Sequence, residues 1–385
     1  MSLAVAVPIG IERNKSAARF YAPELDALRF FAFFGVFIFH AAPRTMDFYA
    51  AAGCPQWLGK LLIAIFGSGA FGVDLFFALS AYLITSLLLR ERESTGSVDV
   101  RGFYIRRILR IWPLYLSFVA FAAVMAHFLP GQNLPTKYVL GYGLLAGNWV
   151  YAFYGLPASF AIPLWTVSIE EQFYLLWPLA VRKASRRAIA AIAVGILLVA
   201  NLWRMWLAVS AAPIERMEYN TFTRLDPIAL GILIALYRDR LPDWSRRQRV
   251  ALLLSGALSS VGMYALCVST NAPKLSTGRI ALGHAVTALA STAILLSVLG
   301  ANSGFLRNKT LLYLGKISYG LYVLHEFAHF CAMRLLPAAT PLRVIMQSMI
   351  GLALTLALAL ASYRWLESPF LRLKERFAHV QSRPV

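Results

Sequence analysis

Ionisable residues inside otherwise apolar runs are the most informative feature of this sequence. The stretch "PLWTVSIEEQFYLLWP" (163–178) carries Glu170 and Glu171 side by side near its middle. A carboxylate at bilayer depth costs roughly 3 kcal/mol even on lenient insertion scales. That cost is offset where the carboxylate pairs with other groups in a polar cavity, so these residues are candidates for proton transfer or substrate binding.

The first apolar run, "LDALRFFAFFGVFIFH", places Arg29 and His40 eleven residues apart. Eleven steps of about 100° return a helix to within about 20° of the same face and raise it by roughly 16 Å. Both side chains therefore lie on one stripe, where an imidazole can accept a proton near neutral pH. Either residue alone is also compatible with a structural role, as a snorkelling arginine or a hydrogen-bonded core histidine.

Further ionisable groups are expected at the middle and outer depth of other helices. Asp74, in "GVDLFFALSAYLI", and Glu170 each lie about 10 Å from the outer end of their helices. Thr166 and Tyr174 lie one turn on either side of Glu170 and share its face. Glu171 points about 100° away, toward another helix. The remaining groups of this set are Arg224, Asp226, His325, Glu326 and His329.

A second cluster is basic and is expected on the cytoplasmic side. The segment "RRILRIWPLY" places Arg106 and Arg110 one helical turn apart, with Arg107 adjacent to the same face. This spacing can clamp a phosphate through paired hydrogen bonds, but it is equally compatible with simple anchoring of the helix at the membrane surface. Arg29 and Lys316 are expected at a similar depth.

The elements that position these residues are apolar helices. Of 385 residues, 59% are hydrophobic and only 14% charged, whereas about a quarter of the residues of a soluble domain are charged. The composition predicts an all-α polytopic membrane protein, with about ten transmembrane helices around a central cavity. The expected spans are 25–42, 67–89, 108–129, 163–181, 188–209, 224–237, 250–268, 280–300, 311–335 and 343–366.

The distribution of basic residues sets the orientation of these spans. The run 138–153 is ambiguous, because counting it as a full span would turn the basic loops that follow to the outside. Treated as a re-entrant or interfacial segment, it leaves most of the 37 basic residues on the cytoplasmic side, as the positive-inside rule requires. Both termini are then cytoplasmic, with tails over 1–24 and 367–385 flanking a transmembrane domain over 25–366.

The net charge of +19 could indicate nucleic-acid binding, but basic loops that face anionic membrane lipids explain it better in so apolar a chain. No nucleic-acid partner is therefore expected. The three cysteines show no metal-ligand spacing, so neither a metal site nor a disulfide framework is expected. The first apolar run has no cleavage site of the signal-peptide type after it.

Seven motifs, in order along the chain, resemble the acyltransferase 3 family of bacterial integral-membrane acyltransferases. One departure is Ala81, where the family usually has glycine, and the hydrolase-like domain that some members carry is not expected after the last span. The resemblance covers nearly the whole chain, from residue 25 to about 370. The motifs are the Arg29–His40 pair, "GVDLFFALSAYLI", "RRILRIWPLY", "LWTVSIEEQFYLLWP", "RLDPIALG", "LGKISYGLYVLH" and "WLESPF".

The resemblance implies transfer of an acyl group, most often acetyl from acetyl-CoA, to a hydroxyl of a sugar in a surface polysaccharide, lipid-linked glycan or similar acceptor. Acyl-CoA would be a co-substrate and not a permanently bound cofactor, and the protein would lie in the bacterial inner membrane. His40 is the expected general base, oriented by Asp74, Glu170 or His325. The expected acyl-CoA ligands are Arg29, Arg106, Arg107, Arg110 and Lys316. The expected residues of the acceptor cavity are Tyr174, Trp165, Arg224, Asp226 and His325.

Two alternatives stay open at this stage. Transfer can be direct, or it can pass through an acyl-histidine, which would give ping-pong kinetics. A proton-coupled transporter or flippase of a glycan or acyl compound would also place charged groups along a membrane pathway, although such proteins more often show an internal repeat, and none is visible here. Consumption of a thioester separates the two classes, since a transporter needs none.

Overall fold

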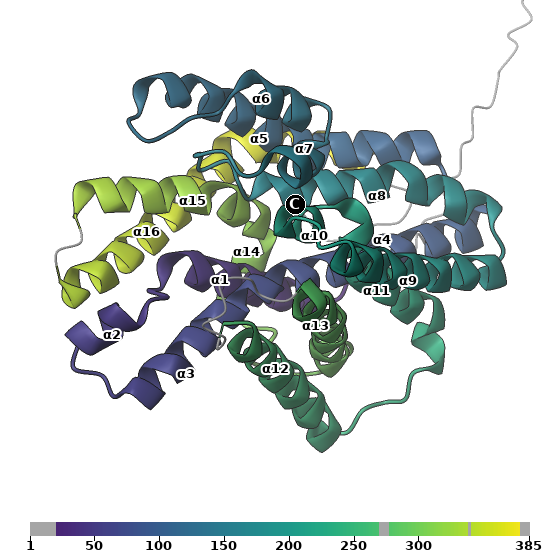
Figure 1. Ribbon diagram of the computed structural model, residues 1–385. Helices are drawn as coiled ribbons and strands as arrows, with labels where there is room; N and C mark the ends of the chain where they lie inside the picture. Colours follow the sequence, from purple (N-terminus) through teal and green to yellow (C-terminus); the bar gives the residue numbers. More distant parts are fainter. Residues whose placement is uncertain (1–20, 269–276, 338–339, 378–385) are drawn as a thin grey trace, which may run out of the picture.

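The computed structural model describes residues 21–268, 277–337 and 340–377, and within them the chain is helical (Figure 1). Extended backbone pairs there only at an isolated bridge between Asn133 and Ala158, so no strand is formed in the described residues. The predicted all-α architecture is confirmed for this part of the chain. Most of the predicted N-terminal tail (residues 1–20) and the end of the predicted C-terminal tail (378–385) lie outside the described residues.

Six helical segments are long and apolar enough to cross a membrane. Each has at least 21 residues, and about 20 apolar residues suffice to span the hydrocarbon core. Several such segments in one chain make it a multi-pass membrane protein. They are Gln56–Thr95, Val100–Phe128, Arg186–Val209, Arg246–Cys267, Gly278–Val298 and Pro341–Phe377.

Helices also cover the other predicted spans, and these carry more of the charged residues that were singled out in the sequence. The count of ten spans and the cytoplasmic position of both termini stay predictions. These helices are α1 (Pro23–Ala41), α8 (Leu164–Lys183), α11 (Asp226–Tyr237), α14 (Lys309–Lys316) and α15 (Ser318–Leu335). Two short helices complete the connections, α2 (Met46–Ala51) and α10 (Ile214–Glu218).

The ambiguous run 138–153 does not form one long helix. It folds into α6 (Thr136–Gly143) and α7 (Gly147–Tyr154), which pack against each other and against α8. An eight-residue helix is about 12 Å long, and the hydrocarbon core is about 30 Å thick, so neither helix can span it. This agrees with treating the run as a re-entrant or interfacial segment.

Two predicted spans have different boundaries in the structure. The span 67–89 corresponds to α4 (Gly72–Thr95), which α3 (Gln56–Gly67) precedes across a 3₁₀ turn. The span 311–335 is divided at Ile317 into α14 and α15. Close packing accompanies this break, because a Cβ at Gly315 would lie only 1.9 Å from the backbone oxygen of Asp26 in α1. Only glycine lets α14 approach α1 so closely.

The last span also ends differently from the prediction. Helix α16 (Pro341–Ser362) continues through a π-helical turn (Tyr363–Glu367) into α17 (Ser368–Lys374). A wide turn suits this place because Pro369 has no backbone N–H to donate into a regular α-helical ladder. Helix α17 packs against α5 (Val100–Phe128), so the first part of the predicted tail belongs to the packed domain.

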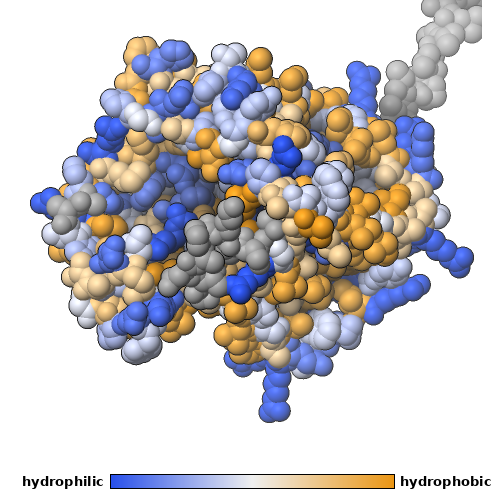
Figure 2. Space-filling model, in the orientation of Figure 1, coloured by the Kyte–Doolittle hydropathy of each residue, from blue (hydrophilic) through white to orange (hydrophobic). Residues whose placement is uncertain are grey.

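Helix α1 occupies the middle of the fold and packs against α4, α14 and α15 (Figure 1). Helices α12 (Arg246–Val268) and α13 (Thr277–Val298) pack against each other, and α9 (Arg186–Val209) packs against α11 and α13. Figure 2 shows apolar residues gathered on the right of the view, over α9. Exposed apolar side chains of α9 include Leu198, Leu202, Met205 and Val209. Such a surface suits contact with lipid.

Candidate active site

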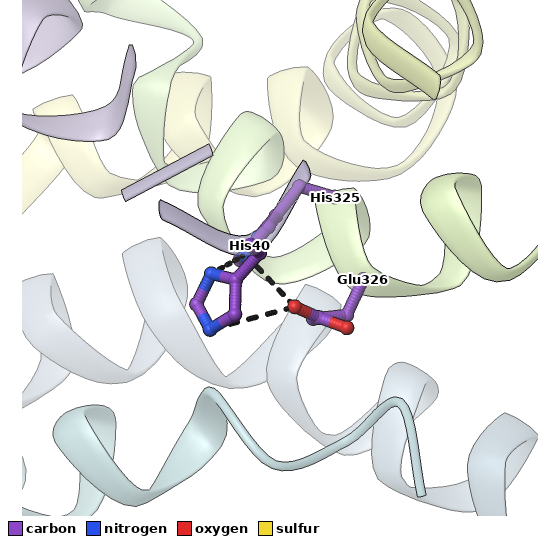
Figure 3. A group of neighbouring side chains, drawn as sticks. All are labelled: His40, His325 and Glu326. Carbon is purple, nitrogen blue, oxygen red and sulfur yellow. Dashed lines mark hydrogen bonds and ion pairs between the residues drawn. The ribbon is translucent and has the colours of Figure 1, made fainter. Parts of the chain in front are cut away.

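Two histidines and a glutamate from two helices meet near the C-terminal end of α1 (Figure 3). His40 lies in the last turn of α1, and His325 and Glu326 are consecutive in α15. The Nε2 atom of His325 is 3.2 Å from Nδ1 of His40. The Oε1 atom of Glu326 lies 3.5 Å from Nε2 of His40 and 3.8 Å from Nε2 of His325. The sequence suggested His325 as a partner of His40 but gave no role to Glu326.

Backbone carbonyls fix both imidazole rings. Nδ1 of His40 is 2.9 Å from the oxygen of Val36, and Nδ1 of His325 is 2.6 Å from the oxygen of Tyr322. A carbonyl oxygen can only accept a hydrogen bond, so each Nδ1 donates and each Nε2 keeps a lone pair. The side chain of His40 is 27% exposed, whereas His325 is buried. His40 therefore offers a basic nitrogen that molecules outside the helix bundle can reach.

The same three side chains form a donor set of the kind that binds divalent metals. One ligand atom from each lies within 4.8 Å of the others. Two imidazoles and a carboxylate are typical zinc ligands, and a backbone carbonyl that orients each ring is a usual second layer of such a site. The prediction that the protein needs no metal stays a prediction.

A cavity of about 170 Å³ follows α1 on the side of Arg29. Lys316 and Asp26 both line the cavity, and Gly315, the residue before Lys316, packs on Asp26 of α1. The basic end of the cavity therefore lies near the start of α1. Tyr322 lines the cavity, and its ring centre is 5.6 Å from that of His325, so the apolar end of the cavity lies near the histidines. The basic side chains that line the cavity are Arg29, Arg107, Arg110, Lys316 and Lys374. The apolar end includes Val73, Phe76 and the ring of Tyr322.

Of the five predicted phosphate-binding residues, all but Arg106 line this cavity, and Lys374 also lines it. Arg106 lies outside the cavity, 3.1 Å from the buried carboxylate of Glu91, and donates to the backbone oxygen of Phe377 at 2.5 Å. Buried Glu91 requires a counter-ion, and Arg106 supplies it. Arg107 and Arg110 therefore line the cavity, and the structure does not bring Arg106 there with Arg110. Lys374 was missed, because it follows the π-helical turn.

The two adjacent glutamates face different surroundings. Glu170 lines the cavity and accepts a hydrogen bond from the hydroxyl of Tyr174 at 3.1 Å. Glu171 accepts from Nε1 of Trp112 on α5 at 3.0 Å. This is the division of faces that helical spacing predicts. Glu170 is not among the groups that contact His40, and Glu326 occupies the place that the sequence suggested for Glu170 or Asp74.

We expect Glu170→Gln to reduce acyl transfer at least tenfold with near-normal folding. The substitution keeps the shape of the side chain but removes a charge that interacts with Arg29 and Arg107 in the cavity. Glu171→Gln is the matched control, because its amide oxygen still accepts from Trp112. Acyl transfer is measured for both variants at equal membrane levels. If Glu171→Gln were inactive and Glu170→Gln active, Glu171 and not Glu170 would be the glutamate needed for acyl transfer.

The other predicted polar residues form ion pairs between helices. Oδ1 of Asp74 lies 3.0 Å from Nη2 of Arg224, and both side chains are buried. The Arg224 guanidinium also contacts His284 on α13 and lies 5.6 Å from the centre of the Trp165 ring. These contacts join α4, α8 and α13 around the start of α11, and they do not include His40.

Asp226 is paired in the same way, at the start of α11. It accepts from the guanidinium of Arg204 on α9, which is 1% exposed, and from Nδ2 of Asn201 at 3.1 Å. Loss of one partner from a buried pair of this kind costs about 3–5 kcal/mol of stability. The geometry gives Asp226 a part in holding α9 against α11. Its predicted place in an acceptor cavity stays a prediction.

Comparison with known proteins gives a consistent result. Residues 23–364 match a family described as an acyltransferase domain. The chain is 28% identical over 379 residues to the peptidoglycan O-acetyltransferase OatA of Listeria monocytogenes, covering 93% of this chain and 57% of the relative. It is 28% identical over 393 residues to a putative peptidoglycan O-acetyltransferase, YrhL, of Bacillus subtilis, covering 92% and 56%.

A putative O-acetyltransferase of Staphylococcus aureus (strain COL) is 27% identical over 373 residues, covering 91% of this chain and 57% of the relative. The chain thus spans little more than half the length of the curated relatives that it matches. No solved structure matches it significantly.

Proposed function

The chain belongs to this acyltransferase family, and from that membership we propose that it moves an acyl group from acyl-CoA to a hydroxyl of a cell-surface glycan. The relatives are named O-acetyltransferases, which favours acetyl as the group transferred. Two are named for peptidoglycan, so a glycan of that class is the proposed acceptor. The six long apolar helices support a place in a membrane, which we propose is the bacterial cytoplasmic membrane. The distribution of basic residues supports both termini on its inner side.

The position of His40 between two approaches carries this proposal. On one side, the cavity presents five basic side chains at its far end and apolar walls near the histidines. Phosphates of CoA suit the basic end, and the thioester arm suits the apolar walls. On the other side, His40 and Glu326 have side chains that are 27% and 23% exposed, which leaves room for an acceptor hydroxyl.

The chemistry follows from the orientation of the His40 ring. Nε2 accepts the proton of the acceptor hydroxyl as its oxygen attacks the carbonyl carbon of the thioester. The carbon–sulfur bond then breaks, and the CoA thiolate takes the proton from the imidazolium. Glu326, 3.5 Å from Nε2, stabilises the imidazolium while it carries that charge. The Nδ1–Val36 hydrogen bond keeps the basic nitrogen pointed at the hydroxyl.

The test uses membranes that contain the full chain, acetyl-CoA labelled in the acetyl group, and purified peptidoglycan as the acceptor probe. We expect alkali-labile label on the glycan and stoichiometric release of free CoA. CoA labelled in its adenine ring is the control, since it leaves no label on the glycan in the same reaction. Release of no CoA and formation of no ester with peptidoglycan or the cell-envelope fraction would contradict acyl transfer and favour the transporter alternative.

A further inference from the structure

We propose that Tyr322 limits the length of the acyl group, so that the donor site accepts acetyl and rejects longer chains. This inference rests on the proposed function, because it takes the cavity as the acyl-CoA site. The ring of Tyr322 packs against that of His325, with ring centres 5.6 Å apart. Tyr322 lines the cavity, whereas His40 and His325 do not.

The position of Tyr322 places its ring in the path of the acyl group. The ring centre lies 5.6 Å from that of His325, whose ring centre is in turn 5.0 Å from that of His40. The backbone oxygen of Tyr322 also accepts from Nδ1 of His325 at 2.6 Å. An acyl group that extends from the cavity toward Nε2 of His40 therefore meets the Tyr322 ring.

Hydrogen bonds to α8 hold this ring in place. The Tyr322 hydroxyl accepts from Oγ1 of Thr166 at 2.9 Å and donates to the backbone oxygen of Pro163 at 3.3 Å. The residue is only 7% exposed, so rotation of the ring would leave polar groups buried without partners. Tyr322 is thus a fixed wall, and it cannot swing aside for a larger substrate without losing both bonds.

Phe76 narrows the same passage from the other side. It lines the cavity from α4, and its ring meets that of Tyr322 edge to face with centres 5.6 Å apart. Interlocked aromatic rings leave little free volume. A hydrophobic site that fits one chain length discriminates against an added methylene by roughly 10- to 200-fold. Acetyl adds only a methyl group beyond its carbonyl carbon, and each longer acyl chain must displace one of these two rings.

The experiment measures the affinity of the purified full chain, in lipid nanodiscs, for CoA, acetyl-CoA, propionyl-CoA and butyryl-CoA. For the wild type we expect affinity to fall at least tenfold from acetyl-CoA to butyryl-CoA. Tyr322→Leu should abolish that difference and leave the affinity for free CoA unchanged, because the phosphate-binding end is intact. The ratio of propionyl to acetyl transfer should rise in the same variant.

Three further variants sharpen the test. Tyr322→Phe keeps the ring but removes both hydrogen bonds that hold it, so its preference for acetyl should lie between those of the wild type and Tyr322→Leu. Phe76→Ala opens the passage from the opposite wall and should accept butyryl-CoA even if Tyr322→Leu does not fold. Phe330→Leu is the matched control for the acetyl-to-butyryl ratio, because Phe330 is another aromatic residue of α15 but packs against Phe160 and does not line the cavity.

Two results would contradict this inference, and only one of them would also contradict the proposed donor site. If Tyr322→Leu folds and binds CoA but keeps the wild-type preference for acetyl, Tyr322 does not select the acyl group. The same conclusion follows if Tyr322→Leu does not fold and Phe76→Ala keeps that preference. In either case the proposed function is unaffected. If the wild type binds none of the four CoA species, the donor site itself is wrong, and this inference is overturned with it.

Discussion

His40→Ala is expected to reduce acyl transfer by about 10²- to 10⁴-fold, the usual contribution of a general base. The variant should still reach the membrane in normal amount, because His40 is partly exposed and its Nδ1 bond is to a carbonyl of its own helix. Loss of the imidazole removes the nitrogen that accepts the hydroxyl proton and leaves both substrate approaches in place. The rate is measured with saturating acetyl-CoA at matched protein levels.

His127→Ala is the matched control for this variant. His127 makes the same local bond, from Nδ1 to the oxygen of Ala123 four residues earlier at 2.9 Å, but it lies near the exposed end of α5. It should retain wild-type transfer. If His40→Ala kept more than a few per cent of the wild-type rate, His40 could not be the base, and Glu326 would become the stronger candidate.

The sequence predicts well those features that depend on local periodicity. Apolar runs predict the helices, because in lipid the backbone N–H and C=O groups of a single run can all form hydrogen bonds only within a helix. The division between Glu170 and Glu171 follows from the 100° step of the α-helix and from nothing else in the fold. The same step predicts that Arg29 and His40 lie on one stripe of a single helix. In the structure this helix carries Arg29 at the cavity and His40 at the contact with His325.

Features that depend on a partner from a distant part of the chain could not be predicted. Both Asp74 and Arg224 are visible as polar residues in apolar surroundings, but no local signal shows that they bind each other. Glu326 is equally visible, yet its neighbour is set by the packing of α15 on α1. Lys374 reaches the cavity only because the π-helical turn directs α17 back along α5.

The arginines of α5 show this limit most clearly. From spacing alone, Arg106 and Arg110 share a face as well as Arg107 and Arg110 do, since residues three and four apart are both neighbours on a helix. The buried carboxylate of Glu91 on α4 decides between them, because it binds Arg106 and thereby sets which side of α5 faces the cavity. That information lies in α4, outside the motif that suggested the phosphate clamp.

Arg107→Ala and Arg110→Ala should therefore raise the KM for acetyl-CoA with little effect on stability. A hydrogen bond to a charged group contributes about 1.5–3 kcal/mol, which corresponds to roughly a 10- to 150-fold change in KM. Both side chains line the cavity, and Nε of Arg107 has no hydrogen-bond partner among the described residues. Among the described residues neither guanidinium forms an ion pair with a carboxylate; Arg107 acts on Glu170 and Glu171, and Arg110 on Glu367, only through longer-range charge. Folding should therefore be preserved.

Arg106→Ala should do the opposite. It leaves the carboxylate of Glu91, whose side chain is 4% exposed, without its counter-ion, and breaking a buried pair in this way costs about 3–5 kcal/mol. The thermal unfolding midpoint should fall, while the KM for acetyl-CoA of the folded fraction stays near the wild-type value. Measuring both quantities for all three variants separates the roles. If Arg106→Ala raised the KM for acetyl-CoA and left stability normal, Arg106 and its partner Glu91 would belong to the acyl-CoA site, contrary to this assignment.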